Sequence, residues 1–368
     1  MPHAPTITTD SLREMLSSGE AVNIIDIRPK QERSEWFIPG SIHLDVYDML
    51  KQNDATALNN VYLDKSVPLV TVCAGGKMSL VAADKLQQEG YTAFSLLDCM
   101  KGWSLAWNTA YQQFQNFELW QIRRTSKGCL SYVIASNREA IIVDASLPIE
   151  VYTQLVDQHH LSVKYVIETH IHADHLSRSK EVGQYLHAPL YLPVPNKVQF
   201  EFNPINEGTR FSIGSVTLKS LHTPGHTLES FSYYIDNKIL ITGDTLFTNG
   251  VGRPDLKSTT EESREKAHML YQSINKLLSL PDTIVVLPAH TNKPAEFDNV
   301  LIKTTIGGAR QNIILLKSDE EEFVNSLLQK IPPTPPNFLD IVEKNIVGNY
   351  QGVNVIDLEA GANRCAVS

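Results

Sequence analysis

Short apolar runs and an amphipathic segment alternate along the first third of the chain. Residues 22–27, 67–72 and 91–96 are largely apolar over the length of a strand, which is typical of buried strands. Residues 79–88 have apolar side chains at helical spacing, with a serine placed to cap the helix and Gly90 placed to end it. Strands separated by helices predict βαβ units and a parallel sheet.

A different pattern begins after residue 117, where apolar runs of strand length each end in a potential metal ligand. Residues 239–243 lead to Asp244, and residues 284–289 lead to His290. His226 follows a Pro-Gly pair, which predicts a tight turn that fixes the backbone presenting it. Strand ends of this kind gather donors that are distant in sequence at one rim of a sheet. The periodicity by itself indicates only a mixed α/β domain.

The densest cluster of potential ligands is the sequence THIHADH at residues 169–175. It contains three imidazoles and one carboxylate, from His170, His172, Asp174 and His175. Imidazole and carboxylate are ligands that zinc and iron prefer. A single histidine is more often structural, but four donors this close together indicate a metal site.

Length and composition describe a globular protein of two domains. The chain has 368 residues, of which 42% are hydrophobic and 20% are charged. A polar stretch at residues 109–116 separates the two patterns, so we predict domains at 1–108 and 117–368 joined by this linker. The net charge of −9, without a block of Lys and Arg, argues against a nucleic-acid partner. No apolar run reaches the length of a membrane span, so we expect no membrane partner either.

The N-terminus and the cysteines indicate a cytoplasmic protein. The first five residues, MPHAP, have neither the basic start nor the apolar core of a signal peptide. The four cysteines are Cys73, Cys99, Cys129 and Cys365, and their spacing shows no pairing. We therefore expect a cytoplasmic chain whose cysteines are free thiols.

Cys73 lies where a predicted strand meets a predicted helix. The loop after it contains Gly75 and Gly76, which allow backbone N–H groups to turn inward, and Lys77 adds a positive charge. These donors and the start of the helix favour a thiolate. A thiolate held in this way is a sulfur nucleophile, whereas the alternative interpretation is a buried and inert cysteine.

The sequence around this loop closely resembles a single-domain rhodanese over residues 5–108. Besides the cysteine loop, the resemblance rests on three segments: DIR at 26–28, WFIPGSIHL at 36–44 and KGW at 101–103. It implies a parallel-sheet sulfurtransferase in which Cys73 forms a persulfide and Gly76 and Lys77 bind the sulfur donor. Ser79 also matches the rhodanese loop pattern.

Two positions depart from that pattern. Rhodanese loops often have arginine where this chain has Met78, and they usually have Gly-Gly where it has Asp98-Cys99. Both departures bear on the recognition of the sulfur donor, while the nucleophile is intact. We predict no chemical role for Cys99 or for Cys129.

The second half of the chain resembles the metallo-β-lactamase superfamily over about residues 117–310. The resemblance rests on the order HxHxDH, then His226, Asp244 and His290. It implies an αββα sandwich with the metal site at one edge of two packed sheets. The fold class we predict is therefore α/β, with an N-terminal rhodanese-like domain and a C-terminal metallo-β-lactamase sandwich.

Two metal chemistries are compatible with these donors. Two zinc ions with a bridging hydroxide would hydrolyse a thioester, as in the glyoxalase II branch. A single Fe(II) held by two histidines and one carboxylate would leave open positions for a substrate and O₂. Ligand types alone do not decide, because all seven donors are present.

Three features favour the iron alternative. The motif continues with Leu-Ser-Arg at 176–178 rather than with the Gly-Gly-Asn type of stretch usual in glyoxalase II. The segments at 242–247, 252–253 and 361–365 resemble persulfide dioxygenases, which oxidise glutathione persulfide with O₂ and water to sulfite and glutathione. The rhodanese part would interconvert thiosulfate and glutathione persulfide, so both domains would serve sulfide detoxification.

The resemblance to persulfide dioxygenases also implies site residues. One Fe(II) per chain would be bound by His170, His226 and Asp244, and Arg253 would hold substrate charge unless it is a salt-bridged structural residue. The remaining donors would orient these ligands or bind an alternative metal: His172, Asp174, His175 and His290. Cys365 is expected near the site.

Three possibilities stay open. A dinuclear zinc thioester hydrolase with a fused rhodanese is the alternative function, and a redox sensor based on Cys73 is a third reading that leaves the metal donors unexplained. The sequence does not determine the oligomeric state, and a homodimer is one possibility. The proline-rich segment at 331–336 is predicted to be extended and to carry the C-terminal segment back across the domain.

Overall fold

The N-terminal unit is built on a five-stranded parallel sheet with the order β1-β5-β4-β2-β3. The structure is a computed structural model that describes residues 4–193 and 198–367, so residues 1–3 of the predicted first domain lie outside the described residues. The strands are Thr6–Ile7 (β1), Asn23–Asp26 (β2), Ile42–His43 (β3), Leu69–Val72 (β4) and Ala93–Leu96 (β5). The helices are Thr9–Ser18 (α1), Lys30–Glu35 (α2), Tyr47–Lys51 (α3), Lys77–Gln88 (α4) and Cys99–Trp103 (α5).

The predicted strands and the long helix of this unit are confirmed, but the helix start is not the one predicted. Helix α4 begins at Lys77, and its N-cap is Gly76 in a left-handed conformation with φ of 97°. That conformation, which glycine adopts at low cost, turns the chain from the loop into the helix two residues early. Ser79 is therefore inside α4, where its hydroxyl is free to face the sulfur of Cys73 instead of capping the helix.

The segment predicted as a linker is mostly strand. Trp107–Gln113 (β6) pairs antiparallel with Glu118–Arg124 (β7) along its whole length and forms the edge of the next sheet. An edge strand with one exposed face accommodates polar side chains, which explains why its composition resembled that of a linker. Hydrogen bonds also join the two units directly, since the Trp103 indole donates to the Ser126 hydroxyl at 3.0 Å.

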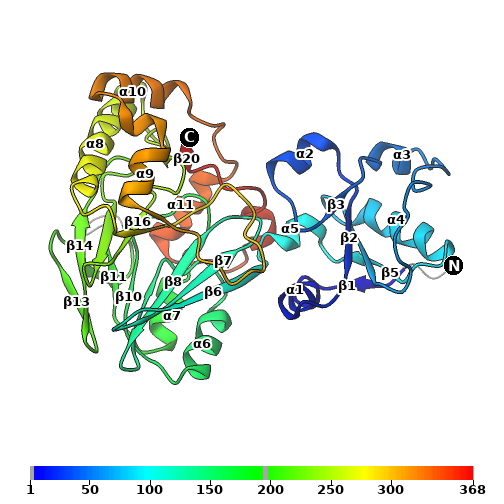
Figure 1. Ribbon diagram of the computed structural model, residues 1–368, viewed down its shortest axis with the longest axis horizontal. Helices are drawn as coiled ribbons and strands as arrows, with labels where there is room; N and C mark the ends of the chain where they lie inside the picture. The colour runs from blue at the N-terminus through cyan, green and yellow to red at the C-terminus, as the bar shows by residue number, and fades with distance from the viewer. Residues whose placement is uncertain (1–3, 194–197, 368) are drawn as a thin grey trace.

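The C-terminal unit consists of two packed sheets with helices on their outer faces, which confirms the predicted αββα sandwich (Figure 1). The seven-stranded sheet has the order β12-β11-β10-β9-β8-β7-β6, and the six-stranded sheet has the order β13-β14-β15-β16-β18-β19. The further strands of the first sheet are Leu130–Ser136 (β8), Glu139–Val143 (β9), Ser162–Ile167 (β10), Leu190–Leu192 (β11) and Asn203–Pro204 (β12). The second sheet contains Arg210–Ile213 (β13), Val216–His222 (β14), Phe231–Ile235 (β15), Ile239–Gly243 (β16), Val285–Pro288 (β18) and Thr304–Thr305 (β19).

The core between the two sheets is made of alternating apolar side chains from both, such as Ile134 and Ile241, which are fully buried. Helices Ile149–Gln158 (α6) and Ser179–Tyr185 (α7) cover the first sheet. Thr260–Leu278 (α8), Ile306–Asn312 (α9), the 3₁₀ turn Ile314–Lys317 and Glu320–Gln329 (α10) cover the second. Burial of apolar surface on both faces of each sheet stabilises the strands, so their ends present loops from a rigid frame.

The last part of the chain returns to the edge of the sandwich, as predicted. After the proline-rich segment come Phe338–Val347 (α11) and Val355–Leu358 (α12), and then Ala366–Val367 (β20) pairs antiparallel with Val251–Gly252 (β17). This pairing holds the tail beside the loops that carry the predicted metal ligands. None of the helices in the described part of the chain is both long and apolar enough to cross a membrane.

Candidate functional site

Three predicted ligands come together at one edge of the sandwich. His170 lies in the loop after β10, His226 in the loop after β14, and Asp244 directly after β16. One potential ligand atom from each lies within 4.8 Å of the others, and all three residues are buried. The Nε2 atoms of His170 and His226 lie 3.8 and 3.5 Å from Oδ2 of Asp244. That oxygen is buried and has no hydrogen-bond partner among the described residues, so the group fits a metal ion.

The hydrogen bonds of His226 fix which ring nitrogen can bind a metal. Its Nδ1 lies 2.7 Å from the backbone oxygen of Arg253. A carbonyl oxygen only accepts, so Nδ1 carries the proton and Nε2 presents a lone pair toward Asp244. Burial lowers the pKa of His226, which keeps the ring neutral as a ligand must be.

Hydrogen bonds through Thr169 to Asp144 likewise fix which ring nitrogen of His170 can bind a metal. The Thr169 hydroxyl donates to Oδ2 of Asp144 at 2.8 Å, and it lies 2.9 Å from Nδ1 of His170. Because the only hydroxyl proton goes to the carboxylate, the hydroxyl accepts from Nδ1–H and leaves the Nε2 lone pair for a metal. Burial lowers the pKa of His170 well below the usual value. Asp144 and Thr169 were missed because a carboxylate at a strand end and a threonine give no signal without their spatial partners.

Glycines allow the backbone to approach the ligands closely. A Cβ atom on Gly225, whose φ is 145°, would lie 2.4 Å from Cα of Leu270 in α8, so the predicted Pro-Gly turn before His226 requires glycine. A Cβ atom on Gly252 in β17 would lie 1.9 Å from the backbone oxygen of Asp244. Side chains at these positions would displace the segments that carry two of the three ligands.

A second group of donors surrounds the carboxylate of Asp174. Its Oδ1 lies 3.1 Å from Nδ1 of His175, and its Oδ2 lies 2.9 Å from Nε2 of His290 and 3.2 Å from Sγ of Cys129. The side-chain amide of Asn363, from the C-terminal tail, donates to the same Oδ2 at 2.8 Å. Burial opposes ionisation here, but the two histidines hold the pKa of Asp174 well below its usual range.

His290 connects this group to the first one. Its Nδ1 lies 2.6 Å from Oδ1 of Asp244, and Cys365 also approaches both residues. The carboxylates of Asp174 and Asp244 outweigh burial and raise the pKa of His290 well above its usual value. Cys365 is therefore near the site as expected, whereas Cys129, to which we had assigned no role, immediately precedes β8 and lies in the cluster.

His172 lies between the two groups. Its ring contacts those of His170 and His175, with centroid distances of 4.2 Å in both cases. Neither of its ring nitrogens has a hydrogen-bond partner among the described residues, although Nε2 lies 3.3 Å from Oδ1 of Asp144. His222, in contrast, has a structural position at the end of β14, where Nε2 contacts the backbone oxygen of Leu228.

Arg253 is a salt-bridged structural residue, which is the alternative that we left open for it, and its guanidinium is not free to hold a substrate. Its side chain is fully buried and makes two hydrogen bonds to the carboxylate of Asp255, at 2.8 and 2.7 Å. The remaining guanidinium nitrogen donates to the backbone oxygens of Pro333 and Arg364. Arg253 thus ties the C-terminal tail to the site, and its own backbone oxygen orients His226.

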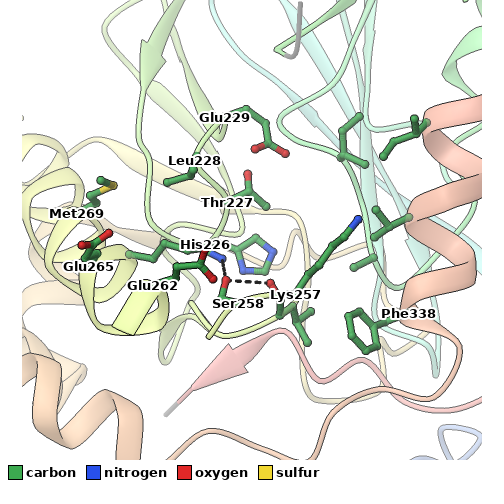
Figure 2. Close-up of a pocket in the computed structure, with 16 residues that line it drawn as sticks. His226, Thr227, Leu228, Glu229, Lys257, Ser258, Glu262, Glu265, Met269 and Phe338 are labelled. Carbon is green, nitrogen blue, oxygen red and sulfur yellow. Dashed lines mark hydrogen bonds between the residues drawn. The ribbon is translucent and has the colours of Figure 1, made fainter. Parts of the chain in front are cut away.

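A pocket of about 460 Å³ opens beside His226 (Figure 2). Its walls come from the loop after His226, from the segment before α8, from α8 and from α11. Apolar side chains such as Leu228 and Phe338 share the lining with charged ones, including Lys257 and Glu229. Figure 2 shows the long side chain of Lys257 extended along the pocket. Apart from His226, these lining residues did not stand out in the sequence, because their chemistry becomes apparent only when the four segments meet.

The sulfur of Cys73 lies in the loop between β4 and α4, surrounded by hydrogen-bonding groups. Sγ accepts from the N–H of Gly76 at 3.1 Å and lies 3.4 Å from the Ser79 hydroxyl and 3.8 Å from Sγ of Cys99. The contact with Cys99, followed by those with Ser79 and Gly76, outweighs burial and lowers the pKa of Cys73 from 9.0 to about 5. The side chain of Lys77 is exposed at the start of α4.

Comparisons with known proteins agree with this architecture. Residues 124–290 match the metallo-beta-lactamase superfamily, and residues 8–106 match the rhodanese-like domain. An uncharacterized protein of Mycobacterium leprae is 31% identical over 50% of this chain and 91% of its own length. Glyoxylase B2 of Dictyostelium discoideum is 32% identical over 46% of this chain and 64% of its own length. The crystal structure of ETHE1 from Myxococcus xanthus shares the fold, with a TM-score of 0.54 and 24% identity over 66% of this chain and 99% of that one.

Proposed function

The chain belongs to the metallo-β-lactamase superfamily and carries a rhodanese-like domain before that fold, and from this premise we propose that it is a persulfide dioxygenase coupled to a sulfurtransferase. The substrate of the metal site is glutathione persulfide, which reacts with O₂ and water to give sulfite and glutathione. His170, His226 and Asp244 hold one Fe(II) per chain. When bound, the iron would supply open coordination positions for the persulfide sulfur and O₂.

The observation that carries this proposal is the contrast between two buried aspartates. Oδ2 of Asp244 has no hydrogen-bond partner among the described residues, as expected of an oxygen reserved for a metal. Oδ2 of Asp174 is already engaged by the amide of Asn363 and by Cys129. A carboxylate supplied with hydrogen-bond donors is suited to orienting neighbours such as His290 rather than to binding a second ion. The contrast supports one metal position.

The pocket beside His226 suits the thiol carrier. Its volume of about 460 Å³ is within the range of small-molecule sites. Glutathione has two carboxylates and one ammonium group. In the pocket, Lys257 is available to bind a carboxylate and Glu229 to bind the ammonium group. Apolar residues between these charges, among them Leu228, would exclude water from the sulfur end. This arrangement would direct the persulfide toward the three ligands.

The N-terminal domain supplies the persulfide in this proposal. A Cys73 with a pKa of about 5 is a thiolate at neutral pH and attacks the outer sulfur of thiosulfate. A new S–S bond forms at Cys73 while sulfite leaves with the electron pair of the broken bond. The thiolate of glutathione then takes the outer sulfur, which regenerates the Cys73 thiolate and gives glutathione persulfide.

A dinuclear zinc thioester hydrolase is the second candidate function. The observation that favours it is the second donor group, in which Cys129, Asp174, His175 and His290 offer ligand atoms within 4.8 Å of one another. The unpartnered nitrogens of His172 would add a further ligand. The similarity to Glyoxylase B2 is compatible with this function.

Oxygen consumption separates the two functions. The full chain, purified without oxygen and loaded with iron, is expected to take up O₂ and release sulfite when glutathione persulfide is added in an oxygen electrode. Metal analysis of the same preparation is expected to give one iron per chain. Absence of O₂ uptake, together with hydrolysis of S-lactoylglutathione and two zinc ions per chain, would refute the dioxygenase and favour the hydrolase.

A further inference from the structure

The sulfur of Cys99 lies close to that of the proposed nucleophile. The two Sγ atoms are 3.8 Å apart, and the backbone N–H of Cys73 donates to Sγ of Cys99 at 3.2 Å. Cys99 is fully buried, and its other polar contacts are the backbone oxygen of Leu96 and the hydroxyl of Ser79, at 3.2 and 3.0 Å. The loop residues Ala74 and Gly75, which follow Cys73 in the sequence, are exposed.

The backbone at Cys99 is strained. Asp98 and Cys99 both have left-handed conformations, with φ of 53° and 45°. Residues other than glycine adopt this region only at a cost in free energy, and rhodanese sequences usually have Gly-Gly at this place. In this chain Cys99 adopts that unfavourable conformation, and its thiol contacts Cys73. A strained conformation that brings two reactive groups together is an indication of function.

We propose that Cys99 is the resolving thiol of Cys73, so that the sulfurtransferase domain can discharge its own persulfide. The inference rests on the proposed function, because it requires a persulfide at Cys73. When no acceptor thiol takes the outer sulfur, Sγ of Cys99 attacks Sγ of Cys73. A disulfide forms between the two cysteines, the persulfide S–S bond breaks, and the outer sulfur leaves with the electron pair and the Cys99 proton as hydrogen sulfide.

This step is balanced without any external oxidant. The outer sulfur is reduced to sulfide, and the two cysteines are left oxidised as a disulfide. The two sulfur atoms must approach from 3.8 Å to the bond length of about 2.05 Å.

The consequence is a self-limiting sulfur carrier. While glutathione is available, the persulfide is passed on and Cys99 acts only as a hydrogen-bond donor to Cys73. When the acceptor is scarce, the disulfide blocks further loading until a thiol reductant opens it. Formation of the Cys73–Cys99 disulfide would keep a reactive persulfide from accumulating on the protein.

The test is anaerobic loading of the full-length, iron-loaded protein with thiosulfate in the absence of any acceptor thiol. Three readouts are followed together: sulfite released on loading, sulfide released afterwards, and the state of the Cys73 and Cys99 peptides by mass spectrometry. The wild type is expected to release sulfite and sulfide in equal amounts and to yield a Cys73–Cys99 cross-linked peptide. A sample without thiosulfate is expected to show no cross-link.

Two variants separate resolution from loading. Cys99→Gly suits the left-handed backbone and removes the thiol, while Cys99→Ser keeps a hydrogen-bond donor but cannot form a disulfide. Both are expected to release sulfite, to keep one added sulfur on Cys73 and to release no sulfide. Either variant releasing sulfide as the wild type does would overturn the inference.

The failure of this inference differs from the failure of the proposed function. A wild type that retains its Cys73 persulfide, with Cys99 reduced and no sulfide released, overturns the resolving role and leaves the sulfurtransferase intact. Absence of sulfite release and of added sulfur in the wild type and in both variants overturns the sulfurtransferase, and the resolving role with it.

Discussion

The ionisation of Cys73 should depend on Cys99. In the folded protein the pKa of Cys73 is lowered from 9.0 to about 5, with the contact to Cys99 as the largest cause. At pH 7 the residue is therefore ~99% thiolate, since each pH unit above the pKa changes the ratio tenfold. The perturbation is Cys99→Gly, which removes the thiol at a position whose φ of 45° glycine tolerates.

The expected shift follows from the value of one hydrogen bond to a charged group. Such a bond contributes ~1.5–3 kcal/mol, and 1.36 kcal/mol corresponds to about one pKa unit. The Gly76 N–H and the Ser79 hydroxyl still contact the sulfur in the variant. The pKa of Cys73 should therefore rise by about 1–2 units, to about 6–7. Because a raised pKa leaves less thiolate at low pH, the variant should react about 5- to 50-fold more slowly than the wild type at about pH 5.

The assay is the rate of alkylation of Cys73 by iodoacetamide across a pH series, read from the Cys73 peptide by mass spectrometry so that the other thiols do not interfere. The midpoint of the rate profile reports the pKa. Asp98→Gly is the matched control, because it changes the adjacent left-handed residue and keeps the thiol of Cys99. A wild-type midpoint near that of an ordinary cysteine would refute the reasoning, as would an unchanged midpoint in Cys99→Gly.

The other predictions concern the metal centre, the pocket and the independence of the two domains. Asp244→Ala should lose its metal during anaerobic purification, while Asp174→Ala should bind it only ~10–100-fold more weakly, as measured by metal titration; equal and complete loss in both would argue for two metals. Thr169→Val removes the acceptor of the His170 Nδ1–H and should weaken metal binding by a similar ~10–100-fold, with Thr169→Ser as a control that retains binding. Lys257→Gln should raise KM for glutathione persulfide about two- to fivefold with kcat unchanged, because an exposed ion pair contributes ~0.2–1 kcal/mol; an unchanged KM would remove Lys257 from the carrier site. Cys73→Ser should abolish thiocyanate formation from thiosulfate and cyanide but keep O₂ uptake with added glutathione persulfide, and loss of both in a folded, iron-loaded variant would contradict independent sites.

Local patterns predicted those parts of the fold that depend on local physics. Apolar runs such as residues 67–72 had to be buried, and β4 lies there. Strand β6 was missed because an edge strand with an exposed face has the same polar composition as a linker. The start of α4 was misplaced because the left-handed conformation of Gly76, rather than a serine cap, turns the chain into the helix. For β6 the deciding contact, its pairing with β7, comes from outside the segment, and for α4 the deciding feature is the conformation of one glycine.

The same distinction applies to two residues at the functional sites. Arg253 was a candidate for holding substrate charge, with a salt-bridged structural role as the alternative, and its partners are Asp255 and the backbone oxygens of residues 333 and 364. Cys99 was given no role, yet it lies 26 residues after Cys73 in sequence and 3.8 Å from it in space. The one local sign was the replacement of the Gly-Gly pair usual in rhodaneses by Asp98-Cys99, which are two residues that the backbone does not favour there.

The number of metals illustrates why donors alone do not define a site. Asp174 and Asp244 are the same residue type, both are buried, and both follow motifs that predict ligands. What distinguishes them is that Oδ2 of Asp174 receives hydrogen bonds from Cys129 and from Asn363. Asn363 is 189 residues away along the chain and belongs to the tail that the pairing of β20 with β17 holds beside the site. Oδ2 of Asp244 receives no such bond within the described structure. Replacing Asn363 with alanine should therefore remove one hydrogen-bond donor from Oδ2 of Asp174, while Cys129 and His290 keep their contacts with it. A gain of affinity for a second zinc ion in that variant would link the tail directly to the choice between one metal and two.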